Sequence, residues 1–196
     1  MAEKPKERRT QEQRRAETRT LLMDTARDLF LTNGYDQTGM PELVRKAGLT
    51  RGALYHHFDD KADLFRAVAE REAAAIGQAI EQATVDITDP GDALTVGTNA
   101  YFDAMSVNGR ATLLLSLAPA VLGLNDAKAL GASQGSAELR DGLSAALPAL
   151  TDADLTALTD VLSAGFDRAA QEIAEGADRQ TYTNALLHIV KRLLDG

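Results

Sequence analysis

The residues most able to do chemistry are two adjacent histidines, His56 and His57, in the stretch LTRGALYHHF (residues 49–58). A neutral imidazole can bind a metal ion, transfer a proton or donate a hydrogen bond. Neighbouring residues of a helix point about 100° apart, so these two rings cannot easily share one metal ion. We expect no metal site. Donation to phosphate oxygens explains the pair better, with His57 the better candidate because His56 need not face a nucleic acid.

A second pattern is that of a serine nucleophile. GASQG, residues 131–135, matches G-x-S-x-G around Ser133, and Asp178 and His188 follow in the order of an α/β-hydrolase triad. That motif requires a strand before the serine and a helix after it. The preceding LNDAKAL does not read as a strand. We therefore expect no enzyme, and hydrolysis by Ser133 is kept as the alternative.

Composition limits the function further. The 196 residues contain no cysteine, which excludes a disulfide framework, a thiolate nucleophile and a thiolate zinc site. No apolar run is long enough to span a bilayer, and the N-terminal MAEKPKERRT lacks the apolar segment of a signal peptide. These features indicate a cytoplasmic protein that needs no cofactor and has no membrane partner.

The charge is distributed unevenly along the chain. The net charge is −8, yet residues 1–58 hold 11 Lys/Arg and 8 Asp/Glu, giving +3, while the remainder holds 10 and 21, giving −11. A basic end on an acidic body suggests that the basic end meets a polyanion. A solvated charged arm is the alternative.

The spacing of apolar residues predicts helices almost throughout, and no run alternates as a strand does, so the expected fold class is all-α. Residues 123–136, which contain three glycines, give the least clear pattern. The expected N-caps are Thr38, Thr50, Asp60, Asp89 and Thr151. The expected helices cover residues 12–33, 39–47, 50–56, 61–80, 90–105, 111–118 (stopping at Pro119), 138–147, 152–173 and 178–194.

Two of these helices, 39–47 and 50–56, are short and joined tightly at Gly48. This is the shape of a helix–turn–helix, whose second helix can enter the major groove of DNA. Leu43 and Leu54 are expected to pack inward against the first helix of the chain. The residues that then face outward are Arg51, Gly52, Ala53 and Tyr55.

This segment resembles the DNA-binding part of the TetR family of transcriptional regulators. The resemblance rests on LFLTNGYDQT, residues 29–38, followed by A-G-L-T-x-G-x-L-Y-x-H-F-x-x-K-x-x-L, residues 47–64. It extends over residues 15–65 without a gap. The family more often has small polar and β-branched residues where this chain has Gly39-Met40-Pro41, which puts the entry into the second helix in question.

The resemblance implies roles for individual positions. Arg51 is the best candidate for a pair of hydrogen bonds to guanine, worth ~1–3 kcal/mol of discrimination. Arg14, Arg15 and Arg19 would either add phosphate or minor-groove contacts or form a solvated helix face. The DNA-binding residues expected are Thr38, Thr50, Arg51, Gly52, Ala53, Tyr55, His57 and Lys61.

The middle of the chain is expected to hold a small-molecule effector. Ordinary core packing accounts for most of its apolar residues, but in the TetR family this region encloses a ligand pocket. Few charges are expected to be buried there, which favours an apolar or weakly polar effector. The ligand-binding residues expected are Phe102, Met105, Leu117, Val121 and Phe166.

The last helix is apolar on more than one side, which indicates a second buried face. With the resemblance, this implies a homodimer through the last two helices, residues about 151–194, that reads a palindromic operator in double-stranded DNA. The expected organisation is a flexible arm (1–11), a three-helix DNA-binding domain (12–60) and a helical ligand-binding and dimerisation domain (61–196). The function expected is a ligand-responsive regulator, more often a repressor than an activator. A ligand-free architectural DNA binder is a third possibility.

Overall fold

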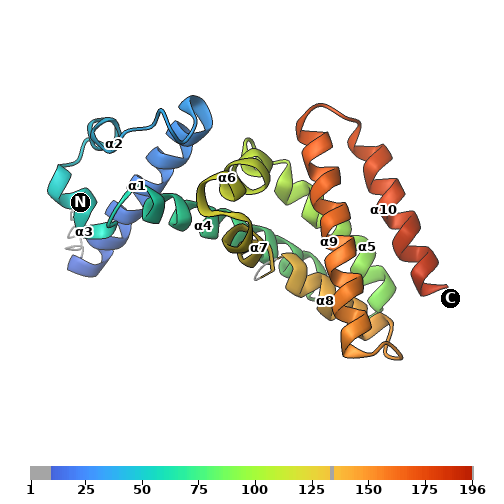
Figure 1. The fold of residues 1–196 in the computed structure, drawn as a ribbon. Helices are drawn as coiled ribbons and strands as arrows, with labels where there is room; N and C mark the ends of the chain where they lie inside the picture. Colours follow the sequence, from blue (N-terminus) through green and yellow to red (C-terminus); the bar gives the residue numbers. More distant parts are fainter. Residues whose placement is uncertain (1–9, 133–134, 196) are drawn as a thin grey trace, which may run out of the picture. The chain divides into compact units, whose positions relative to one another are not determined.

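A computed structural model describes residues 10–132 and 135–195 of the chain (Figure 1). Its regular structure is helical and includes no strand within those residues, which confirms the expected all-α class. The helices are α1 (Gln11–Asn33), α2 (Met40–Ala47), α3 (Arg51–His57), α4 (Lys61–Thr84), α5 (Pro90–Met105), the π-helical segment η1 (Thr112–Leu117), α6 (Ala118–Leu122), α7 (Leu124–Ala132), α8 (Gly135–Ala146), α9 (Asp152–Ala174) and α10 (Arg179–Leu194).

The chain divides into two compact units. The first ends at Val68 and the second begins at Ala69, so the division lies inside α4. The sequence placed the end of the first unit at residue 60, just before this helix begins. Over the described residues, no helix is long and apolar enough to cross a membrane.

The first unit begins with a well-capped helix. The Thr10 hydroxyl accepts from the Gln13 N–H at 3.2 Å, and the Gln13 side chain accepts from the Thr10 N–H at 2.8 Å. This reciprocal capping box satisfies two backbone donors that a helix start leaves unpaired. The flexible arm was expected to reach residue 11, but the helix already begins at Gln11. The rest of that expectation, residues 1–9, lies outside the described residues.

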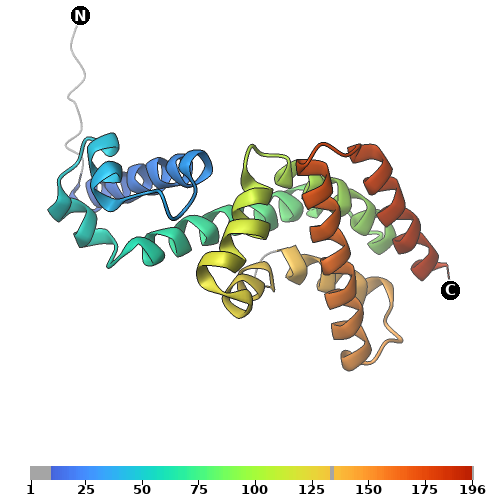
Figure 2. The same ribbon diagram turned by 45° about the horizontal axis from the view of Figure 1, so that its top comes forward.

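In the first unit α2 and α3 lie beside α1 (Figure 2), and the core is formed by side chains of these helices and of the first turns of α4. The Phe30 ring packs edge-on against Phe65 with centroids 5.2 Å apart, and Tyr35 packs on Phe65 at 5.4 Å. Leu21 of α1 points away from this core and is 43% exposed. The fully buried aliphatic residues here are Leu22, Ala26, Leu43, Leu54, Leu64 and Val68.

The start of α2 differs from the expectation. Thr38 was predicted as its N-cap, but the cap is Gly39, which has no side chain to accept a hydrogen bond. The Thr38 side chain instead turns inward, where its hydroxyl lies 2.8 Å from the Gly34 carbonyl and 3.2 Å from the Leu29 carbonyl. Both carbonyls are at the C-terminal end of α1, and that of the C-cap residue Gly34 has no partner inside the helix. Thr38 therefore joins α1 to α2 and is only 1% exposed.

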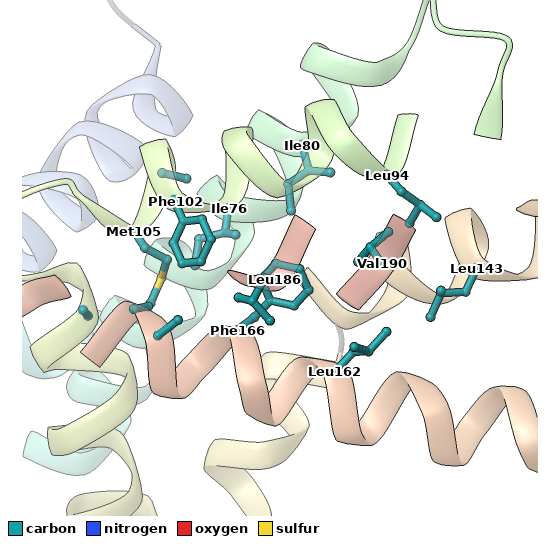
Figure 3. Close-up of a cluster of buried hydrophobic side chains, with 14 of the residues drawn as sticks. Ile76, Ile80, Leu94, Phe102, Met105, Leu143, Leu162, Phe166, Leu186 and Val190 are labelled. Carbon is teal, nitrogen blue, oxygen red and sulfur yellow. The ribbon is translucent and has the colours of Figure 1, made fainter. Parts of the chain in front are cut away.

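The core of the second unit is formed by side chains of α4, α5, α8, α9 and α10 (Figure 3). The rings of Phe102 and Phe166 lie 5.9 Å apart at its centre. Leu186 and Val190 of α10 are buried in the same cluster. The N-caps expected for α5 and α9 are confirmed: Asp89 accepts from the Asp92 N–H, and Thr151 accepts from the Asp154 N–H.

The helix around Pro119 contradicts the expectation that it stops there. It passes through η1 and α6 and ends only at Gly123, whose φ of +86° suits glycine. Proline has no N–H to give the carbonyl four residues earlier, that of Leu115. In η1 the hydrogen bonds reach back five residues, as from the Ala118 N–H to the Leu113 carbonyl. The side-chain amide of Gln171 in α9 donates to the Leu115 carbonyl at 3.2 Å.

Candidate DNA-binding helix and ligand cavity

The orientation of α3 is fixed by an N-cap at its start and by two buried side chains. The Thr50 hydroxyl accepts from the Ala53 N–H at 3.2 Å, as expected of an N-cap. Leu54 is 0% and Phe58 is 2% exposed. These contacts hold one side of the helix in the core and leave Arg51, Gly52 and Tyr55 exposed, with Ala53 partly covered.

The turn between α2 and α3 is the tight reversal of a helix–turn–helix. Gly48 has φ +66° and ψ +27°, a left-handed conformation that other residues adopt at a cost. The Leu49 N–H bonds back to the Val44 carbonyl at 3.1 Å, which closes the end of α2. The two helices are therefore joined in the arrangement that the sequence predicted.

Arginines of α1 lie near the end of α3. The guanidinium carbon of Arg19 is 5.0 Å from the Phe58 ring centroid, and its Nη1 donates to the Met23 sulfur. Burial lowers the pKa of His57, with further lowering from the charges of His56, Arg15 and Arg19. Positive charge from two helices thus favours the neutral form of the His57 imidazole, in which a ring N–H can still donate a hydrogen bond.

Not all of the predicted DNA-binding residues are equally accessible. The Lys61 ammonium donates to the Tyr35 carbonyl at 2.9 Å and lies 4.2 Å from the Tyr35 ring centroid, which holds it beside the α1–α2 turn. Arg51 extends along α3, with its guanidinium carbon 5.3 Å from the Tyr55 ring centroid. Thr38 is buried with its hydroxyl used internally, and we leave it out of the interface. Within the described part of the chain, no cluster of three or more side chains could hold a metal ion.

The second unit contains a cavity of about 780 Å³ lined by α4, α5, η1, α6, α7, α8 and α9. This is within the ~300–1,000 Å³ range typical of ligand sites. Of the predicted ligand residues, Met105 and Phe166 line it. Phe102 lies in the core against Phe166 instead, and neither Leu117 nor Val121 is on the described wall.

Sequence reasoning missed the polar side of this cavity. The Tyr101 hydroxyl donates to Asp167 Oδ1 at 2.9 Å. Burial raises the pKa of the Asp167 carboxyl, an effect that the Tyr101 hydrogen bond partly offsets. Burial and the neighbouring Asp167 raise the pKa of Tyr101 well above its usual value. Both groups line the cavity.

A signal for these residues was present in α9. Polar residues recur there at intervals of three or four, beside the apolar stripe that was recognised. Such spacing puts them on one side of the helix. The polar residues with this spacing that line the cavity are Asp160, Ser163, Asp167 and Gln171.

The serine motif does not gain support. Ser133 itself lies outside the described residues. The helix α7 occupies the place before it where a hydrolase would need a strand. Asp178 is used as the N-cap of α10, where it accepts from the Thr181 N–H at 2.8 Å and from the Thr181 hydroxyl.

A helix–turn–helix with an exposed second helix defines the class of helix–turn–helix DNA-binding proteins. Comparisons with known families identify the family within this class. Residues 22–68 match the family described as "Bacterial regulatory proteins, tetR family", and residues 91–196 match "Tetracyclin repressor-like, C-terminal domain". The chain therefore belongs to the TetR family, whose members are DNA-binding transcriptional regulators and not enzymes.

Individual relatives agree with this assignment. The chain is 39% identical over 88 residues to the transcriptional regulator AcrR of Shigella flexneri, covering 45% of this chain and 40% of that protein. It is 34% identical over 89 residues to the transcriptional activator FasR of Mycolicibacterium smegmatis, covering 45% and 41%. The chain thus spans about two fifths of the length of these curated relatives. A crystal structure of a TetR-family regulator from Pectobacterium atrosepticum matches with a TM-score of 0.68 and 30% identity, covering 95% of this chain and 96% of that one.

Proposed function

We propose that this protein is a ligand-responsive transcriptional regulator that binds a palindromic operator as a homodimer. The recognition helix α3 would enter the major groove, with Arg51, Gly52 and Ala53 at the base edges and Tyr55 at a phosphate. His57 and Lys61 would hold phosphates beside it, and Thr50 would fix the start of the helix. Such a protein acts where its operator lies, which in a bacterium is the cytoplasm.

The observation that carries this proposal is the absence of a structural reason for Gly52 on an exposed, capped helix. A Cβ placed at Gly52 would meet only the Thr50 hydroxyl oxygen, at 4.0 Å, among the described atoms. Glycine in a helix costs up to about 1 kcal/mol relative to alanine. Since the fold does not require glycine here, a close approach of the α3 backbone to DNA accounts for it better.

The dimer would form through α9 and α10. Val161 of α9 is 69% exposed and Ile189 of α10 is 47% exposed, so each of these helices presents a large apolar residue to solvent. Leu186 and Val190 pack into the core of their own chain instead. The proposed interface therefore includes only some of the apolar residues of α10. Two-fold symmetry would place two copies of α3 about one turn of DNA apart, ~34–36 Å.

The effector would occupy the cavity of the second unit and release the operator. A ligand shifts such an equilibrium only as far as its affinity differs between the DNA-binding and released states. We propose repression as the outcome, in line with the description of the family that matches residues 91–196.

In vitro selection of double-stranded DNA by the purified chain tests the proposal. Enrichment of a palindrome with half-sites one helical turn apart is the expected result. Enrichment without symmetry would overturn the dimeric mode, and binding without enrichment of any sequence would instead indicate an architectural DNA binder.

A further inference from the structure

The wall of the cavity carries an excess of negative charge. Its described lining includes the carboxylates of Glu81, Glu138, Asp141, Asp160 and Asp167 but only one basic side chain, Lys128. The Lys128 ammonium lies 3.3 Å from Asp160, and this pair is well exposed, with 73% and 59% of the two side chains accessible. The other four carboxylates have no basic partner within the described lining.

The hydrogen-bonding groups on the wall favour acceptors over free donors. The strongest donors are engaged by the protein itself: Tyr101 donates to Asp167, Gln171 to the Leu115 carbonyl and Lys128 to Asp160. In contrast, Glu138 Oε2 is buried and has no hydrogen-bond partner among the described residues. A buried acceptor without a donor is destabilising by ~1–3 kcal/mol or more when it is charged. The cavity wall therefore offers few free donors to an anion, and it offers negatively charged acceptors to a cation.

The rest of the cavity suits an apolar body. The rings of Tyr101 and Phe166 meet edge to face with centroids 5.4 Å apart, and both line the cavity close to Asp167. An aromatic face attracts a cation by ~0.5–2 kcal/mol, depending on how far the pair is desolvated. Aliphatic side chains such as Ile76, Ile80 and Leu114 complete the wall.

We propose that the effector is a lipophilic organic cation, with its charge near the carboxylates of Glu138 and Asp167 and its apolar groups against Tyr101 and Phe166. This rests on the proposed function, in which the cavity is the effector site, and it differs from the apolar or weakly polar effector that the sequence suggested. A fatty acid or another lipophilic anion would meet five carboxylates and a single basic side chain, the Lys128 ammonium beside Asp160, and is expected to bind poorly.

A pair of probes of nearly equal size and opposite charge tests the proposal. Tetraphenylphosphonium and tetraphenylborate present the same four phenyl groups around a positive or a negative centre. Isothermal titration of the full-length protein without DNA should show the phosphonium binding at least about tenfold more tightly, a difference of ~1.4 kcal/mol. Equal affinities, or tighter binding of the borate, would overturn the inference.

Variants then place the charge in the cavity. Glu138→Gln and Asp167→Asn should each weaken phosphonium binding, by roughly three- to tenfold if each contributes ~0.6–1.4 kcal/mol. Glu175→Gln is the matched control, because it removes one negative charge from an exposed residue of the same unit that is not on the described wall. The control should bind like the parent protein. If it weakens binding as much as the cavity variants do, long-range charge explains the effect and the site is wrong.

A separate readout distinguishes this inference from the function on which it rests. With an operator obtained by selection, phosphonium should release the parent protein from DNA at lower concentrations than it releases Glu138→Gln. If the operator is bound but phosphonium neither binds nor releases it, only the cation proposal fails. If no operator is enriched while phosphonium binds as expected, the regulatory function fails and the assignment of the cavity stands.

Discussion

The side-chain amide of Gln171 donates to the backbone carbonyl of Leu115 at 3.2 Å, the carbonyl that an N–H at position 119 would meet in an α-helix. Position 119 is proline, so α9 supplies the donor that the chain of α6 lacks. The contact joins two helices that line the cavity, and it lets a helix continue through a residue that normally ends one. It also connects the backbone distortion of η1 to the wall of the cavity, which both Leu115 and Gln171 line.

This relationship predicts a coupling between residues 119 and 171. Gln171→Met should lower the free energy of unfolding by ~1–3 kcal/mol, because it leaves a partly buried carbonyl without a donor. In a Pro119→Ala background, where an N–H is restored, the same change should cost clearly less. Urea unfolding of the four proteins of this double-mutant cycle measures the coupling. Additive effects would show that the amide does not serve the carbonyl freed by Pro119.

Gly52→Ala should separate stability from DNA binding. The added methyl group meets only the Thr50 hydroxyl oxygen, at 4.0 Å, and does not clash in the free protein, so the variant should be more stable by a few tenths to about 1 kcal/mol. The same methyl group should hold α3 away from the groove and weaken operator binding. Thermal unfolding and fluorescence anisotropy with operator DNA measure the two effects. A variant that is more stable and binds DNA normally would contradict the proposed approach of α3.

Substitutions of Arg51 and Arg15 should affect DNA binding in different ways, the first through base preference and the second through phosphate contact. Arg51→Ala should cost ~1–3 kcal/mol of operator binding and relax base preference at one position of each half-site. Arg15→Gln should weaken binding similarly for all sequences and reduce the slope of affinity against salt by about one. Repeating the selection with each variant, at two salt concentrations, distinguishes these outcomes. Loss of base preference in the Arg15 variant would require a different docking of α1.

The carboxyls of the cavity predict a dependence of stability on pH. Burial raises the pKa of Glu138, with Asp141 and Glu81 adding to the rise, and burial also raises that of Asp167. A carboxyl with a raised folded pKa binds more protons when folded, so stability falls as pH rises through the window between its unfolded and folded pKa values. Glu138→Gln and Asp167→Asn should therefore gain stability relative to the parent protein at pH 7 compared with pH 4. Urea unfolding at both pH values measures this, with Glu175→Gln as the control that should show no such difference.

The proposed dimer predicts the effect of placing charge on α9 and α10. Val161→Glu and Ile189→Glu should leave the monomer fold intact, because both side chains are exposed in the single chain. A charge buried in the interface would instead be strongly unfavourable. Analytical ultracentrifugation should show the parent protein as a dimer at micromolar concentration and the double variant as a monomer. A parent protein that sediments as a monomer would refute the dimer.

Much of the DNA-binding unit could be predicted from the sequence, because its structure is determined locally. Thr50 caps α3, Gly48 reverses the chain, and Leu54 anchors the helix four residues after its cap. Each depends on residues close in sequence, so patterns of type and spacing were sufficient. Thr38 was mistaken for a cap because the alternative partners for its hydroxyl, Leu29 and Gly34, belong to the preceding helix.

The character of the cavity wall was decided by tertiary structure alone. Tyr101 is 66 positions from Asp167 and Gln171 is 56 from Leu115, so neither pairing leaves a trace in local spacing. The glycines and proline of the middle segment read as breaks, whereas packing against α9 supplies the hydrogen bond that keeps the helix through Pro119. The sequence alone determined an all-α chain with a helix–turn–helix at residues 39–56. Which carboxylates would share one cavity depended on how α4, α5, α8 and α9 pack, since burial and proximity are properties of the folded chain.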